Sequence, residues 1–316
     1  MSLPTNALAT YEAVGNREDL SNIIYRIDPT ETPFMSGIQR ETATAVNHEW
    51  QTQALAAAVG TNYQLEGDDI VADAATATVR LGNIAQISRK SAQVSGTQQS
   101  VQHAGRSNEL DYQVMLKGME LKRDMETTLA GTNQAKVTGS DAVVRKTASV
   151  LSWIKSNTSK AGSDPSAADG TGTRSDGTQR AFTESQLKTV LNSIWTAGGK
   201  PNIIMTGAFN KQVFSTFTGR SSPIEQSSSK KIVAAVDAYE SDFGQLKVVP
   251  NRFQRTRDVL VLQMDKWAMA ALKGRNMLSI PLARTGDSER RAVVAEYALV
   301  SRNEKASGGV FDLTTS

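Results

Sequence analysis

One long helical pattern, from Asn108 to Gly131, most constrains how this chain can fold. Its apolar residues recur at spacings of three and four, which places them on one face of an α-helix. They are Leu110, Val114, Leu121, Met125 and Leu129, and Met115 and Met119 widen the stripe. Asn108 suits the N-cap, and Gly131 is placed to end the helix in the left-handed conformation. We expect a rod roughly 35 Å long against which other elements pack.

The opposite face of this helix carries charged residues. We expect Glu120 to pair with Arg123, and Lys122 with Glu126, along the solvent side. Nothing in the pattern of the helix indicates a reaction centre.

The first 45 residues predict an extended arm. Apolar residues are sparse, Pro4, Pro29 and Pro33 interrupt the pattern, and only residues 19–26 favour a short helix. The arm has three basic and six acidic residues, a net charge of −3, although the whole chain carries +3. Such a segment cannot bury enough apolar surface to fold alone, so we expect it to fray or to lie on another surface.

Residues 46–100 show the alternation typical of β-strands. Val46, His48 and Trp50 alternate with polar residues, and a second alternating run begins at Ala77. The glycines and aspartates between the two runs predict a long two-stranded excursion. Because an isolated hairpin is only marginally stable in water, we expect this one to need another surface, such as that of a second subunit.

Two segments of contrasting character follow the long helix. Residues 143–156 favour a moderately amphipathic helix, whereas residues 157–180 are rich in Ser, Thr, Gly, Asp and Ala and predict a flexible surface loop. Asp164, Asp169 and Asp176 do not have the spacing of a calcium-binding loop, and no closing glutamate follows them. We therefore expect no metal site here.

Helical and strand patterns alternate after residue 182. Thr183 caps a predicted helix whose stripe is Leu187, Val190, Leu191 and Ile194. A short apolar strand at 202–206 and a helix at 208–217 follow. Further strands are predicted at 231–239, 244–249, 258–264, 277–283, 291–300 and in the C-terminal segment after a glycine pair.

The composition excludes several classes of protein. The chain has no cysteine, which rules out disulfides, thiolate nucleophiles and cysteine-based zinc sites. Of its two histidines, His48 lies in an alternating strand, and His103 lies in a polar turn where we expect it to be solvated. No window approaches the length of a membrane-spanning helix, and the first residues lack the pattern of a secretory signal, so we expect neither.

The sequence carries no known catalytic motif. Patterns for phosphate loops, α/β-hydrolase nucleophiles and zinc proteases are absent. A hydrolase built on two facing carboxylates is the weakest hypothesis, because it leaves the arm and the excursion without a function. We expect no enzyme activity, no catalytic residue and no cofactor.

The most basic stretch, residues 252–291, has nine basic and four acidic residues, or +5. It is either a solvated face or a contact surface for an acidic partner, which is phosphate or the acidic arm of another copy. A nucleic-acid-binding protein using this region is the alternative to a structural protein, and DNA binding with steep salt dependence would distinguish the two. The candidate contact residues are Trp50, Arg252, Arg255, Arg257, Arg284, Arg290 and Arg291.

The order of these parts carries a resemblance. The arm contains NREDLSNIIYRIDPTETPFMSGI, the excursion opens with HEWQTQALAA, and the long helix contains LDYQVMLKGMELKRDMETTLAG. The α/β region contains PNIIMTGAFNKQVFSTF, and the chain closes with SRNEKASGGVFDLT. Over nearly its whole length the chain thus resembles the major capsid proteins of tailed bacteriophages, which have the Hong Kong 97-like fold.

The resemblance implies an α+β fold in five parts. They are an N-terminal arm at 1–45, an extended β-hairpin loop at 46–95, a peripheral domain with its spine helix at 96–131, an axial α/β domain at 132–245, and a return to the peripheral domain at 246–316. It also implies a major capsid protein that self-assembles into hexamers and pentamers of an icosahedral head enclosing double-stranded DNA.

The resemblance sets expectations about partners and location as well. The implied partners are further copies of the chain, a portal, scaffold or decoration proteins, and non-specifically packaged DNA, without a membrane or a small-molecule substrate. The expected location is the virion, after assembly in the cytoplasm of a bacterial host.

Overall fold

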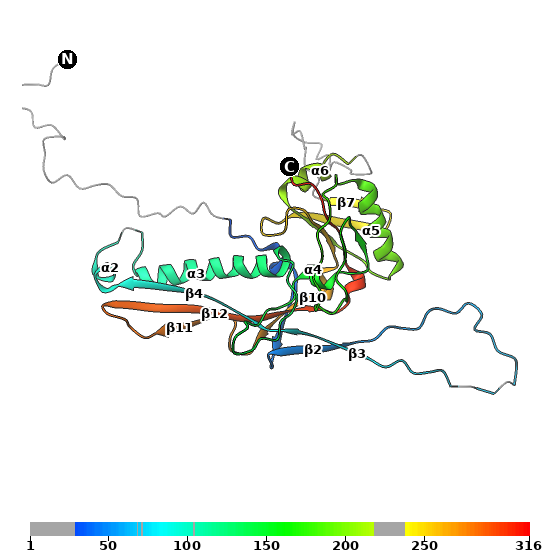
Figure 1. Cartoon of the computed structure of the whole chain (residues 1–316), viewed down its shortest axis with the longest axis horizontal. Helices are drawn as coiled ribbons and strands as arrows, with labels where there is room; N and C mark the ends of the chain where they lie inside the picture. The colour runs from blue at the N-terminus through cyan, green and yellow to red at the C-terminus, as the bar shows by residue number, and fades with distance from the viewer. Residues whose placement is uncertain (1–28, 68, 71, 104, 218–237) are drawn as a thin grey trace, which may run out of the picture.

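The computed structural model describes residues 29–67, 69–70, 72–103, 105–217 and 238–316 (Figure 1). The helix predicted at 19–26 and most of the strand predicted at 231–239 lie outside the described residues. In the described part, the chain forms a mixed helix-and-sheet body from which one long hairpin projects (Figure 1).

The elements follow one another along the whole described chain. The helices are α1 (Pro33–Gly37), α2 (Gly96–Ser100), α3 (Glu109–Glu126), α4 (Val150–Trp153), α5 (Glu184–Thr196) and α6 (Ala208–Phe214), with a π-helical turn η1 (Thr127–Gly131) and 3-10 turns η2 (Met264–Lys266) and η3 (Glu304–Ala306). The strands are β1 (Gln39–Ala43), β2 (Asn47–Thr52), β3 (Val79–Ile84), β4 (Gln86–Ser95), β5 (Thr158–Ser159), β6 (Ile203–Thr206), β7 (Ala238–Ser241), β8 (Gly244–Pro250), β9 (Val259–Leu262), β10 (Trp267–Leu272), β11 (Leu278–Leu282), β12 (Ser288–Ser301) and β13 (Gly308–Val310).

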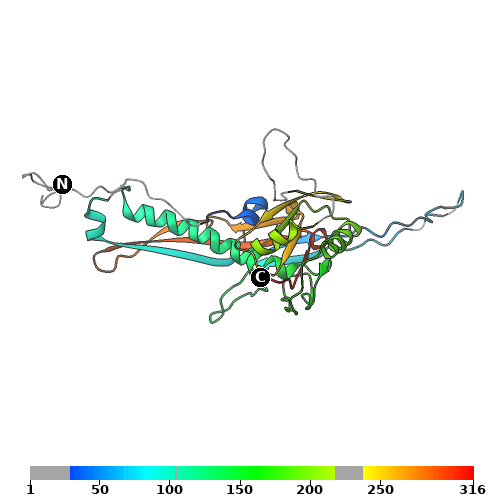
Figure 2. The same ribbon diagram turned by 90° about the horizontal axis from the view of Figure 1, so that it is seen from above.

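A five-stranded sheet is organised around the long strand β12. Strand β4 pairs with it antiparallel along one side. On the other side, β11 pairs with the first half of β12 and β10 with its last residues, and β1 joins β10 in parallel. Seen from above, α3 lies along β4 and β12 (Figure 2). The sheet therefore supports the long helix over most of its length.

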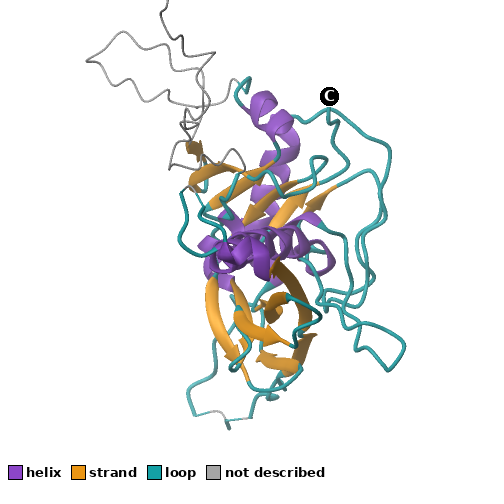
Figure 3. Cartoon of the chain, turned by 90° about the vertical axis from the view of Figure 1, so that its left-hand side faces the viewer, coloured by secondary structure: helices purple, strands orange, loops and turns teal. Residues whose placement is uncertain are grey.

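A six-stranded sheet forms the second part of the body, in the order β5-β13-β9-β6-β8-β7. The predicted helix α5 packs on it with Leu187, Val190, Leu191 and Ile194 buried. Its N-terminus is the expected one, because Thr183 and Gln186 form a reciprocal capping box. In the end-on view, helices occupy the space between the strands of the two sheets (Figure 3).

Helix α3 confirms the predicted rod, including its N-cap, where the Asn108 side chain accepts from the amide of Asp111 at 3.0 Å. The predicted charge pairs along its outer face are wrong. Glu120 binds Lys117 at 2.8 Å, and Arg123 lies over the ring of Phe253. Glu120 thus pairs along the helix with a different residue from the one predicted, whereas Arg123 packs on a ring from outside the helix.

Glu126 was predicted to pair with Lys122 on the solvent side of the helix, but its side chain is fully buried. Its carboxylate accepts the backbone amides of Phe34 and Met35, both at 2.8 Å, and the Asn251 Nδ2 at 2.7 Å. The two amides belong to the first turn of α1, which otherwise has no side-chain cap. Burial raises the pKa of Glu126, and the three donors oppose that rise. One carboxylate thus joins α1, α3 and the segment after β8.

The end of the long helix also differs from the prediction. Gly131 is not among the residues with positive φ; the last turn widens into the π-helical η1. A Cβ at Gly131 would lie 2.0 Å from the carbonyl oxygen of Phe253. Glycine is needed here for close approach of two backbones, not for a left-handed cap.

Part of the predicted arm belongs to the body of the subunit. Phe34 and Met35 in α1 enter the main core, and β1 is a strand of the five-stranded sheet. The expectation that the whole of residues 1–45 needs a foreign surface is therefore wrong for residues 33–43. The arm's apolar residues are few, but these two are placed where α3 and Trp267 enclose them.

Two further predictions fail locally. The helix expected at 143–156 is reduced to α4, and residue Val137 instead bridges to Lys146 in an antiparallel pair. His103 is not solvated: its side chain is 7% exposed and lies 3.8 Å from Glu109. The segment between α2 and α3 folds back on the start of α3, which sequence periodicity does not reveal.

We predict that Glu126→Ala lowers the free energy of unfolding of the unassembled subunit by about 3–5 kcal/mol, because it leaves three buried donors without an acceptor. Chemical denaturation followed by circular dichroism measures this. The control is Asp124→Ala, whose half-exposed carboxylate pairs with Lys90 at 2.9 Å, and which should cost no more than about 1 kcal/mol. Equal effects for both variants would contradict the junction proposed for Glu126.

Candidate intersubunit surfaces

The hairpin beyond β2 and β3 carries a row of exposed apolar residues. Every described residue from 53 to 78 is exposed. Leu55 is 97% exposed and Ile70 99%, with Tyr63 and Leu65 close to 80%. Isolated exposed apolar residues are ordinary, but a row of them on an extended ribbon marks an interaction site.

Trp50 fixes the base of this hairpin to its own subunit. Its indole Nε1 donates to the carbonyl of Ser301 at 3.0 Å, and its ring packs on Trp153 with centroids 5.5 Å apart. His48 beside it lies 3.4 Å from Glu41. The structure thus gives Trp50 an anchoring contact within the subunit, and an intersubunit contact for it stays a prediction.

Arg255 and Arg257 are held by carboxylates of the same chain. Asp176 binds both, at 2.6 and 3.2 Å. Arg255 also lies 3.3 Å from Asp258, and Arg257 donates to Asp312 at 2.9 Å. Both guanidinium groups thus already have carboxylate partners, so a bound phosphate would compete with these internal ion pairs.

Arg252 has the opposite surroundings: it is exposed, and its side chain makes no ion pair with a residue that the structure describes. Of the candidate arginines at 284–291, Arg284 pairs with Glu289, Arg290 donates to the hydroxyl of Thr285, and Arg291 binds Asp111 at 3.1 Å. An intersubunit contact by any of these four arginines stays a prediction.

Asp312 is a structural anchor that the sequence did not reveal. It is 1% exposed, adopts a positive φ of 61°, and accepts the amides of Ala161, Gly162 and Gly177. Burial alone would raise the pKa of Asp312, but these amides together lower it below its usual value. Asp312 thereby ties both ends of the 157–180 segment to the C-terminal strand region.

The prediction of a flexible loop at 157–180 is wrong, because the segment is held by buried contacts. Arg174 is 3% exposed, binds Asp164 at 2.6 Å, and lies 3.5 Å from the ring centroid of Phe311. Burial lowers the pKa of Arg174 to about 10, although Asp258 and Asp312 oppose this. Buried ion pairs and amide hydrogen bonds hold this segment in place of the apolar side chains that it lacks.

The aspartates considered for calcium bind protein groups. Asp164 binds Arg174 and Lys160, Asp176 binds the two arginines, and Asp169 accepts from the amide of Thr171 at 2.9 Å. Among the described residues, no group of three or more acidic or histidine side chains could hold a metal ion. The described residues also contain no helix that is long and apolar enough to cross a membrane.

Solved structures define the class of protein to which this geometry belongs. The capsid of Cyanophage A-1(L) matches with a TM-score of 0.64 at 12% identity, covering 98% of this chain and 99% of that one. The capsid of a native GTA particle also matches with a TM-score of 0.64, at 9% identity and 95% and 96% coverage. The fold is therefore that of the Hong Kong 97-like phage capsid proteins.

The family follows from the sequence comparison. The chain belongs to the SU10 major capsid protein family, whose model matches residues 4–314. It is 25% identical over 347 residues to the major capsid protein of Escherichia phage Phieco32, covering 98% of each. The chain is thus a structural protein whose copies assemble with one another into the icosahedral capsid of a tailed phage. The comparisons give no support to the nucleic-acid-binding alternative.

The buried charge cluster around Asp258 predicts a dependence of stability on pH. Burial raises the pKa of Asp258 from 3.8 to about 6, although Arg255 and Arg174 favour its ionised form. The folded state then binds more protons than the unfolded state between these values, so stability falls as pH rises from about 4 to about 6.

Asp258→Asn should remove this dependence. Wild type should gain about 2 kcal/mol relative to the variant on going from pH 6 to pH 4, as measured by denaturant unfolding of the unassembled subunit. Parallel stability curves for the two proteins across this range would contradict the assignment.

Proposed function

We propose that the exposed hairpin is the element that joins neighbouring copies of this capsid protein, and that hexamers and pentamers form through it. The observation that carries the proposal is the exposure of every described residue from 53 to 78. The hydrogen bonds described for the ribbon beyond Thr52 and Val79 lie within it: Gln53 donates to the carbonyl of Thr76, and the amide of Tyr63 to the carbonyl of Thr61.

Contacts made by such a ribbon can close copies of the chain into rings and so into a shell. A ribbon reaching from one copy onto a different surface of the next makes a heterologous contact, and such contacts close into rings when the rotation allows. Stable contacts of this kind bury more than about 1,000 Å². The two arms of the ribbon, residues 53–65 and 66–78, carry exposed apolar side chains at Leu55, Leu65 and Ile70 that such a contact could bury.

The division of the chain into parts belongs to the same proposal. We assign residues 1–45 to an arm whose residues 33–43 lie in the body of the subunit, 46–95 to the extended loop, 96–131 to the peripheral domain, 132–245 to the axial domain and 246–316 to the return. The five-stranded sheet with α3 supports the peripheral assignment, and the six-stranded sheet with α5 supports the axial one. Strand β4, within 46–95, pairs with β12, so its residues act in the body as well.

Further partners are proposed from the relatives. The structure of Phage G contains gp27 major capsid proteins together with gp26 decoration proteins, at 9% identity and a TM-score of 0.54. We propose that this shell likewise takes additional proteins, including a portal, scaffold or decoration proteins, that it encloses non-specifically bound double-stranded DNA, and that it assembles in the bacterial cytoplasm.

The test of the proposed function is removal of the hairpin tip. We expect a chain in which residues 55–76 are replaced by Asn-Gly to fold with a stability within about 1 kcal/mol of wild type, because the deleted residues contact almost nothing in the subunit. It should form no shells in sedimentation and electron microscopy. Shells of normal size from this variant would refute the proposal.

A second variant separates surface chemistry from length. Leu55, Val59, Leu65 and Ile70 are all replaced by Ser in a hairpin of unchanged length. Assembly should again fail if apolar burial on a neighbour is what joins the copies, whereas normal assembly of this variant would show that these four apolar side chains do not join them.

A further inference from the structure

We propose that the acidic tip of the hairpin docks into a basic pocket between β1 and β10 of a second copy, with Glu66 facing Arg40 and Lys273 of that copy. The inference rests on the proposed function, since it names the surface that receives the hairpin. It is carried by the charge of the ribbon and by the geometry of the pocket.

The ribbon contains acidic residues and no basic ones. Residues 53–78 contain four acidic residues, Glu66, Asp68, Asp69 and Asp73, and neither lysine nor arginine. Glu66 and Asp73 are exposed, and the apolar Leu65 next to Glu66 is 81% exposed. A surface that receives this tip must offer positive charge beside an apolar floor.

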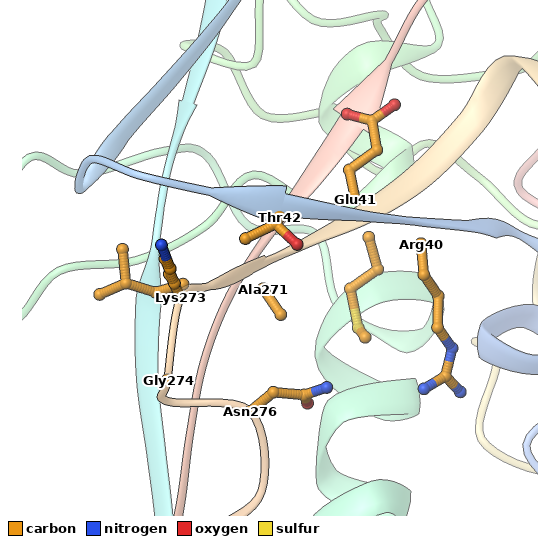
Figure 4. A pocket seen from close by; sticks show the side chains of 9 residues that line it. Arg40, Glu41, Thr42, Ala271, Lys273, Gly274 and Asn276 are labelled. Carbon is orange, nitrogen blue, oxygen red and sulfur yellow. The ribbon is translucent and has the colours of Figure 1, made fainter.

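A pocket on the five-stranded sheet offers both. Because strand side chains alternate, Arg40 and Thr42 of β1 lie on the same face as their register partners Met269 and Ala271 of β10. Lys273, Gly274 and Asn276 close the pocket at the end of β10, and its volume is about 380 Å³. Figure 4 shows the side chains of Arg40 and Asn276 on the same side of β1, with the small side chain of Ala271 between the strands and the loop.

The cations of this pocket are uncommitted. Neither Arg40 nor Lys273 forms an ion pair with any residue in the described ranges. Glu41, the acidic residue of the pocket lining, is directed away from Arg40 (Figure 4) and is engaged by Arg302 and by His48. The pocket therefore presents net positive charge to a ligand.

Another pocket on the molecule does not have this property. At the base of the hairpin, Arg80 and Lys136 line a cavity of about 490 Å³. Arg80 lies 3.6 Å from Glu49, and Lys136 donates to the carbonyl of Gly82 at 2.8 Å. Its cations already have partners, so the pocket of Arg40 and Lys273 is the better acceptor of an acidic segment.

The occupant must come from another copy. Thirteen extended residues carry the tip about 40 Å from the hairpin base, and the ribbon runs away from β10 (Figure 1). Glu66 of a chain therefore cannot reach Arg40 of the same chain in this arrangement. Leu65 would lie against the half-buried Ala271 of the second copy, while the Glu66 carboxylate meets the two cations.

Reciprocal charge reversal tests the pairing. We expect Arg40→Glu with Lys273→Glu to reduce the assembled fraction about tenfold or more, because like charges would then face each other. Glu66→Lys with Asp73→Lys should do the same, and the chain carrying all four changes should recover assembly. Lys200→Glu with Lys305→Glu, an equal charge change at two exposed lysines elsewhere, is the matched control. Thermal unfolding of each subunit checks that the surface changes leave the fold intact.

The outcomes separate this inference from the proposed function. Normal assembly of the Arg40→Glu, Lys273→Glu variant would overturn the pocket, even if removal of the hairpin tip abolishes shells. Failure of the fourfold variant to recover, when each pair alone blocks assembly, would overturn the pairing of tip with pocket. If the chain without its tip still forms shells, the proposed function itself fails.

Discussion

The buried carboxylate of Glu126 is the contact on which the arrangement of the subunit depends. It accepts two amides of α1 and the side chain of Asn251, so one group holds the end of the arm, the long helix and the segment after β8. Removing any donor or the acceptor leaves buried polar groups unpaired, which costs far more than the net gain from a typical hydrogen bond. The three segments are therefore positioned together or not at all.

The chain has two kinds of region: a packed body around this junction, and a ribbon that is exposed. The two sheets, α3 and α5 share buried cores, and the charged cluster around Asp312 closes the 157–180 segment onto them. Trp50 anchors the hairpin base, and beyond it the ribbon is exposed. The body is thus a self-sufficient fold, whereas the ribbon gains its stability only where another molecule covers it. A capsid subunit needs this division, since it must fold before it assembles.

Sequence patterns predicted the helices that are determined by residues close together in the chain. Periodicity and caps gave α3, with Asn108 at its start, and α5, with Thr183. Glu126 was misplaced because its partners lie 92 and 125 residues away, where helical periodicity carries no information. The order of residues 157–180 was missed because ion pairs of Arg174 and the amides on Asp312 replace the apolar side chains that usually signal a packed segment. Among the candidate contacts, the sequence showed that arginines gather at 252–257 but not that Arg255 and Arg257 are paired internally.

The most direct test of the account is amide hydrogen exchange of residues 53–78 in free subunits and in assembled shells. We predict fast exchange in the free subunit, since the ribbon lies outside any described sheet there. Once neighbouring copies cover the ribbon, its exchange should be slower by at least about tenfold. Equal exchange rates in subunit and shell would contradict the claim that a neighbouring copy receives the hairpin.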